Sequence, residues 1–264
     1  ITLGQYVPGA SAVHRLDPRT KILLMIAYIV LIFLVRSLAV FLVPLAFLVL
    51  TVLLSRVPVS YLWTAVKPMR LLIVFMFIIN LFFTPGSTPI FSFWRITIFR
   101  EGLMQGLFIT ARLLLLVAGT SILTLTTSPI ALTDGLEKLL MPLSKLRFPA
   151  HELAMMMTIA LRFIPTLMEE TDRIRKAQMA RGADFETGNL VRRAKSMIPI
   201  LVPLFVSAFR RADELAMAME SRCYHGGEGR TRMRELRFHR GDLVALLVTA
   251  AVVAAVAALN RFAA

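Results

Sequence analysis

The sequence predicts an all-α, polytopic membrane protein with about five transmembrane helices and long cytoplasmic helices between the fourth and the fifth. Three observations support this fold class. The 264 residues are 57% hydrophobic and 17% charged, with a mean hydropathy of +0.73, whereas soluble domains carry more charge and fewer large aliphatic side chains. Several apolar runs approach the roughly 20 residues that cross a bilayer. Of the 30 Lys and Arg residues, 19 lie between residues 128 and 240, apart from the apolar runs.

The first two transmembrane helices are expected near the N-terminus. The first begins at Lys21 with the run KILLMIAYIVLIFLV. The second covers residues 38–54 and contains Pro44. A proline is tolerated in a membrane helix because neighbouring groups can satisfy the carbonyl that loses its backbone donor.

The third and fourth transmembrane helices are separated by an expected external loop. The third apolar run, residues 71–83, is too short to cross alone and needs its flank from about Val66. Residues 84–99 contain proline and glycine breakers and predict the loop. The fourth helix is expected at 103–126, and a fifth apolar run at 243–259 closes the chain.

Basic residues predict the orientation of these helices. The positive-inside rule places Lys and Arg clusters that flank membrane helices in the cytoplasm. One basic cluster precedes the first helix, and the large basic block follows the fourth. Because an even number of helices separates the two, both can be cytoplasmic, with the N-terminus inside and the C-terminus outside.

Residues 128–239 are predicted to form a cytoplasmic region between the membrane segments 1–127 and 240–264. The two apolar pieces in this region fall short of the roughly 18 residues of a spanning helix and continue into charged turns. Their spacing predicts two long helices, at 149–181 and 190–223. Internal prolines should kink them. A shorter amphipathic helix should precede them, with Ser128 as its N-cap.

The two long helices end in similar segments, QMARGADF and MESRCYHG, and share the pattern D-x4-A-x3-R. Each places an arginine, Arg181 or Arg222, near its C-terminus. An arginine there complements the helix dipole, which is the simplest explanation. Small flanking residues suggest a further role, because they would let the backbone approach a partner closely: Ala180, Gly182, Ser221 and Cys223. A guanidinium presented in this way can bind a carboxylate through two hydrogen bonds.

In these features the chain resembles the transmembrane T component of energy-coupling factor transporters. The resemblance rests on PGASAVHRLDPRTK at residues 8–21, on the pattern of membrane helices and on the two X-Arg-X segments. It implies that two cytoplasmic coupling helices dock Arg181 and Arg222 into two nucleotide-binding ATPase subunits. It also implies a separate substrate-binding S component and the plasma membrane of a prokaryote as location. The N-terminal segment looks more like the shared, vitamin-serving type than the dedicated cobalt or nickel type.

Other functions find less support in the sequence. The chain has no G-x4-G-K-[ST] segment to hold ATP, and its four histidines and single cysteine form no metal-ligand pattern. No catalytic activity, cofactor, metal site or nucleic-acid partner is therefore expected. Without a charged relay inside the membrane, a self-contained permease is a poorer alternative. Arg112 is the one charge well inside a predicted span; an internal ion pair, or a later helix start, would explain it.

A run of three methionines lies early in the first long helix: Met155, Met156 and Met157. Methionine fills irregular gaps in protein cores, which is one explanation for the run. Its flexible side chain also suits surfaces that accept different partners. The alternative prediction is therefore that these residues contact the S component.

Overall fold

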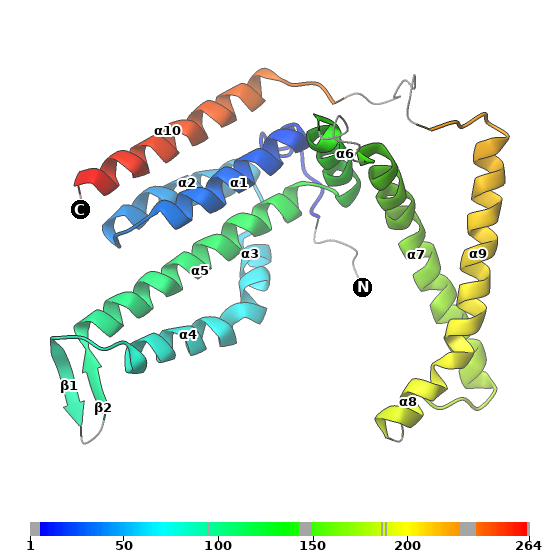
Figure 1. The fold of residues 1–264 in the computed structure, drawn as a ribbon, viewed down its shortest axis with the longest axis horizontal. Helices are drawn as coiled ribbons and strands as arrows, with labels where there is room; N and C mark the ends of the chain where they lie inside the picture. Colours follow the sequence, from blue (N-terminus) through cyan, green and yellow to red (C-terminus); the bar gives the residue numbers. More distant parts are fainter. Residues whose placement is uncertain are drawn as a thin grey trace. The chain divides into compact units, whose positions relative to one another are not determined.

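The computed structural model describes residues 6–93, 96–142, 149–185, 187, 189–226 and 236–262, and helices dominate this part of the chain. The all-α, polytopic fold class is confirmed (Figure 1). The chain divides into two compact units. We call residues 1–139 with 235–264 the membrane unit, and residues 140–234 the helical-hairpin unit. Residues 143–146, the end of the amphipathic helix predicted at 129–146, lie outside the described residues.

The membrane unit contains all the apolar helices predicted to cross the bilayer. Its elements are α1 (Pro18–Leu34), η1 (Ala39–Phe41), α2 (Leu42–Ser55), α3 (Val59–Val66), η2 (Lys67–Met69), α4 (Arg70–Phe83), β1 (Pro89–Phe93), β2 (Ile96–Phe99), α5 (Arg100–Thr126), α6 (Pro129–Leu140) and α10 (Arg240–Phe262). Ser128 caps α6 as predicted, because its hydroxyl accepts the N–H of Ala131 at 3.3 Å.

Among the described residues, three helical segments are long and apolar enough to cross a membrane: Val59–Phe83, Arg100–Thr126 and Arg240–Arg261. The first of these explains how the short third run reaches a sufficient length. Helix α3 and the 3₁₀ turn η2 precede α4 and extend it on its N-terminal side. Helix α1, with 17 residues, and the apolar segment Ala39–Ser55 are shorter.

The predicted external loop contains an antiparallel hairpin of β1 and β2. Its register pairs Phe91 with Ile98 and Phe93 with Ile96. Aromatic and β-branched residues such as these favour extended strands. The Pro and Gly residues of the segment indicated the interruption of the helices but not the strands that follow it.

A buried aspartate joins the start of α1 to the start of α10. The carboxylate of Asp242, 1% exposed, accepts the backbone N–H of Asp17 at 2.8 Å and that of His239 at 2.7 Å. The second bond closes the first turn of α10 in the manner of a capping box, in which a side chain reaches back to the N-terminal amide of its helix. One side chain thus holds two helix starts that are 225 residues apart in sequence.

A buried lysine, Lys21, joins the start of α1 to the end of α5. The ammonium group of Lys21 donates to the carbonyl oxygens of His14 at 3.1 Å and Thr126 at 3.0 Å. Next to it, Arg19 forms a salt bridge with Asp17 at 2.9 Å. These contacts come from the PGASAVHRLDPRTK segment, so its polar residues bind helix ends together.

The start of α1, the end of α5 and the start of α10 therefore lie at one end of the membrane unit. At the opposite end, the amide of Asn260 donates to the carbonyl oxygen of Leu34 at 2.7 Å. Both ends of the intervening segment 128–239 consequently emerge from the same end of the membrane unit.

Arg112 lies within α5, whose start at Arg100 leaves it more than three turns from the helix N-terminus. Its guanidinium donates to the carbonyl oxygen of Val35, just after α1, at 3.1 Å, and lies over the rings of Phe33 and Phe108. Neither expected explanation applies: the helix does not start later, and within the described ranges Arg112 forms no ion pair but binds a carbonyl at a helix C-terminus. Such a carbonyl favours a cation.

Candidate functional site

The helical-hairpin unit carries the predicted arginines on α7 (Ala150–Ala180) and α9 (Ile198–Glu220), with the short α8 (Leu190–Ser196) before α9. The predicted single helix at 190–223 is therefore two helices that meet at Met197. Pro199 explains the break, because it has no N–H to donate to the carbonyl four residues earlier. Pro165 and Pro203 lie inside α7 and α9, which continue through them.

Helices α7 and α9 run antiparallel. The amide of Gln178, near the end of α7, donates to the carbonyl oxygen of Pro199 near the start of α9, at 3.4 Å. Tyr224, just after α9, has its hydroxyl 3.3 Å from Nε2 of His151 in the first turn of α7. Figure 1 shows the two helices running in opposite directions. Their C-termini, and so the two predicted arginines, lie at opposite ends of the hairpin.

Helix α7 ends at Arg181 in a Schellman motif. The N–H of Gly182 donates to the carbonyl oxygen of Met179, and the N–H of Ala183 donates to that of Gln178, both at 3.0 Å. Gly182 has a φ of +86°. In this motif the residue with positive φ is usually glycine, because a Cβ atom is strained there. Gly182 therefore has a structural reason to be glycine, independent of any partner.

Helix α9 ends in the same motif. The N–H of Cys223 donates to the carbonyl oxygen of Glu220 at 2.9 Å, and that of Tyr224 donates to Met219 at 3.1 Å. Cys223 has a φ of +55° and occupies the position that corresponds to Gly182. Each arginine, Arg222 here, is the residue just before the left-handed one. The similarity of the two helix ends thus extends from sequence to backbone conformation.

Both predicted arginines are exposed, as are their small neighbours on either side. Within the part of the chain that the structure describes, neither Arg181 nor Arg222 forms a salt bridge. The backbone geometry leaves each side chain at the tip of a helix. Each guanidinium is therefore available for a carboxylate of another molecule.

The methionines are placed unequally. Met156 and Met157 are 54% and 44% exposed, whereas Met155 is half-buried. The run is therefore available for a partner over part of its surface. Among the described residues, no group of three or more His, Cys, Asp or Glu side chains is arranged to hold a metal ion.

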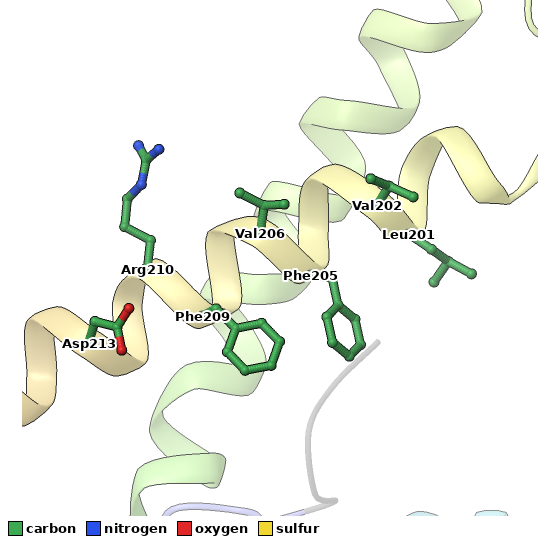
Figure 2. Close-up of a pocket in the computed structure, with 7 residues that line it drawn as sticks. All are labelled: Leu201, Val202, Phe205, Val206, Phe209, Arg210 and Asp213. Carbon is green, nitrogen blue, oxygen red and sulfur yellow. The ribbon is translucent and has the colours of Figure 1, made fainter.

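Sequence reasoning missed an apolar surface on α9. A shallow hollow runs along the exposed side of the helix, lined mainly by apolar residues: Leu201, Val202, Phe205, Val206, Phe209, Arg210 and Asp213. Figure 2 shows Phe205 and Phe209 projecting together from one side of the helix, with their ring centroids 5.3 Å apart. The four-residue spacing of the two aromatic rings was the available signal.

Comparisons with known proteins identify the family. The family model described as cobalt transport protein matches residues 9–233. The energy-coupling factor transporter transmembrane protein EcfT of Thermosediminibacter oceani is 56% identical over 249 residues, 94% of each chain. The protein of that name from Clostridium kluyveri is 55% identical over 262 residues, 99% of this chain and 97% of the relative.

A more distant relative agrees with these two. The protein of the same name from Bacillus subtilis is 49% identical over 253 residues, 95% of this chain and 96% of the relative. The resemblance inferred from the N-terminal segment, the membrane helices and the X-Arg-X ends is confirmed. The chain belongs to the family of energy-coupling transmembrane components of energy-coupling factor transporters.

Proposed function

We propose that this subunit links ATP hydrolysis by two ATPase subunits to micronutrient uptake, most simply of a vitamin, through a separate S component. It has no catalytic role of its own in this proposal. Residues 1–127 and 240–264 form the part within the plasma membrane of the prokaryotic cell. Residues 128–239 form the cytoplasmic coupling region, whose helices α7 and α9 contact the ATPases.

The observation that carries the proposal is the pair of matching helix ends. Arg181 and Arg222 are both exposed, and each is followed by a residue in the left-handed conformation that ends its helix. Two equivalent tips at opposite ends of one hairpin fit two similar partner subunits better than one. Ala180, Gly182, Ser221 and Cys223 flank the arginines with little bulk, so an acidic groove can enclose each guanidinium.

The expected partner group in each groove is a carboxylate. Arginine binds carboxylates through two parallel hydrogen bonds, a geometry that lysine cannot reproduce. Truncating one member of a buried, hydrogen-bonded charge pair costs about 2–5 kcal/mol, since the other charge is left unpaired. One remaining contact would then hold a weakened complex, whereas the loss of both would release the ATPases.

The S component is the proposed partner of the apolar surfaces. The exposed side of α9 around Phe205 and Phe209 is too apolar to remain in water. Met156 and Met157 add an exposed, adaptable surface on α7, with Met155 beside them. A membrane-embedded partner has the apolar residues to cover both. Covering by lipid alone is the competing outcome, and it predicts that alanine at the three methionines leaves S-component binding unchanged.

Purification of the assembled complex tests the role of the arginines. Arg181→Ala and Arg222→Ala should each lower uptake severely, and the double variant should lose the ATPase subunits while its membrane helices stay folded. Lysine at both positions should restore little. Arg192→Ala, which removes an exposed arginine of α8, is the matched control and should retain both ATPases. Stoichiometric ATPases on the double alanine variant would contradict the proposal.

A dedicated cobalt or nickel transporter remains the second candidate, because the matching family model is described as cobalt transport protein. The two candidates differ in which S components bind. Association with several S components of different vitamin specificity supports the shared type. Association with one metal-binding S component supports the dedicated type. Transport by this subunit alone would instead indicate a self-contained permease.

A further inference from the structure

A polar bridge joins α7 and α9 at the centre of the hairpin. The carboxylate of Glu170 on α7 accepts the hydroxyl of Ser207 at 2.6 Å and the guanidinium of Arg211 at 2.8 Å, both from α9. The Glu170 and Arg211 side chains are 24% and 35% exposed. The Ser207 hydroxyl, together with the nearby Arg211 and Arg173, lowers the pKa of Glu170 below its usual value, so the carboxylate is ionised at neutral pH.

The bridge lies at equivalent positions of the two helices. The shift of 41 residues that aligns Arg181 with Arg222 also aligns Glu170 with Arg211. Each arginine tip follows its bridge residue by eleven positions. At 1.5 Å per residue, each tip is about 16 Å from the bridge along its helix.

Because α7 and α9 are antiparallel, the two helical segments of equal length, 170–181 and 211–222, extend from the bridge in opposite directions. An arrangement of this kind has approximate two-fold symmetry about an axis that passes near Glu170 and Arg211. The two arginine tips are then separated by on the order of 30 Å. Two similar partner subunits would require the two arginines to lie at equal distances from one central contact.

The same alignment shows an inversion of charge around the bridge. Acidic positions of α7 correspond to basic positions of α9 and the reverse, in three pairs: Glu169 with Arg210, Glu170 with Arg211, and Arg173 with Glu214. Of these three pairs, Glu170 and Arg211 are in contact across the crossing. Opposite charges there favour the crossing, and like charges would oppose it.

A neighbouring pair provides the contrast. Asp172 and Asp213 are also equivalent, but they carry the same charge and both are exposed. The sign of a charge that faces solvent on one helix does not affect the packing against the other helix. Asp172 therefore serves as a control position outside the bridge of Glu170, Ser207 and Arg211.

We propose that Glu170, Ser207 and Arg211 are positioning residues that fix the crossing of α7 and α9, so that both arginine tips reach their ATPase subunits together. The inference rests on the proposed docking of Arg181 and Arg222. In this proposal the bridge fixes the relative direction of α7 and α9, and thereby the positions of the two arginines, without contacting a partner itself. Without it, one tip can dock while the other is out of reach, and ATP hydrolysis is then poorly linked to uptake.

Charge reversal tests the bridge in the complete complex, reconstituted in lipid nanodiscs for spectroscopy and in liposomes for uptake. Spin labels are placed at Lys176→Cys and Met217→Cys, two exposed and equivalent positions near the tips. Cys223→Gly removes the native cysteine in all variants and keeps a residue suited to positive φ. The readouts are the distribution of label distances and the amount of substrate transported per ATP hydrolysed.

Glu170→Arg and Arg211→Glu should each broaden the distance distribution and lower transport per ATP several-fold. Combining them should restore a narrow distribution and most of the transport, which a loss of folding would not allow. Asp172→Arg makes the same change of charge two residues from Glu170 on α7 and should alter neither readout. Single reversals that leave both readouts unchanged, or a double reversal without recovery, would overturn the inference.

The outcome is separable from that of the docking experiment. If the double alanine variant of Arg181 and Arg222 keeps its ATPases, the proposed docking is wrong whatever the label distances show. If the double alanine variant loses its ATPases but charge reversal leaves the label distances unchanged, only the proposed positioning role is wrong.

Discussion

The residue after each arginine offers a sharp test of why these helix ends carry small side chains. Gly182 has a φ of +86°, and a Cβ atom added there would meet no other atom within 4 Å. A substitution at Gly182 therefore acts on the isolated subunit through backbone strain and not through a clash. The left-handed conformation costs roughly 1–2 kcal/mol for a residue with a Cβ.

Two substitutions at Gly182 separate strain from size. Alanine is small but disfavours the left-handed conformation, whereas asparagine is larger and tolerates it better. In the isolated subunit, Gly182→Ala should therefore loosen the last turn of α7 more than Gly182→Asn does. A loss of 1–2 kcal/mol corresponds to about 5–30-fold faster opening of the hydrogen bonds made by the N–H groups of residues 182 and 183.

Hydrogen exchange of these amides measures the effect directly. The corresponding change on α9, Cys223→Gly, should slow exchange at residues 223 and 224, because it relieves the strain at a φ of +55°. If Gly182→Ala and Gly182→Asn exchange alike at wild-type rates, the strain argument is refuted. If asparagine preserves the helix end but still prevents ATPase binding, a close approach of the partner is what requires a small residue.

Three further predictions concern other parts of the chain. Asp242→Ala removes the acceptor of two backbone N–H groups in a buried site and should destabilise the membrane unit by roughly 2–5 kcal/mol; an unchanged midpoint of thermal unfolding would contradict this. Alanine at the three methionines 155–157 should weaken S-component binding more than ATPase binding in pull-down assays, with leucine milder because it nearly conserves volume; equal loss of both partners would indicate core packing. The native Cys223, exposed and the chain's single cysteine, should resist a membrane-impermeant thiol reagent in intact cells and react after permeabilisation; labelling of intact cells would place this end of α9 outside.

The sequence predicted the type and approximate position of the membrane helices because long apolar runs have few alternative structures. The sequence predicted the ends of these helices less well where the position of a helix end depends on tertiary contacts. The shortness of the run at 71–83 predicted an extension from about Val66, which covers η2, but not that α3 begins the extension at Val59, since the composition of α3 is mixed. The break at Met197 was accessible in principle, because Pro199 lies next to it, but a proline can also be accommodated as a kink.

The arginine tips were predictable in position but not in conformation. Gly182 follows the usual rule that glycine ends a helix, and its role could have been read from the sequence. Cys223 breaks this rule, and only the backbone shows that it occupies the same left-handed position. The bridge of Glu170, Ser207 and Arg211 needed the antiparallel pairing as well, since an acidic and a basic residue 41 positions apart form no local pattern.

Two of the three sequence features that carried the family resemblance have different physical roles. The N-terminal segment contributes buried charges that are paired within the chain: Asp17 and Lys21 are 4% and 6% exposed, and their bonds join the ends of three membrane helices. Arg181 and Arg222 are exposed and have no salt bridge in the described residues. A change in the first feature therefore alters the stability of the membrane unit, whether or not partners are present. A change in the second should leave the isolated subunit almost unaffected and become apparent only in the assembled transporter.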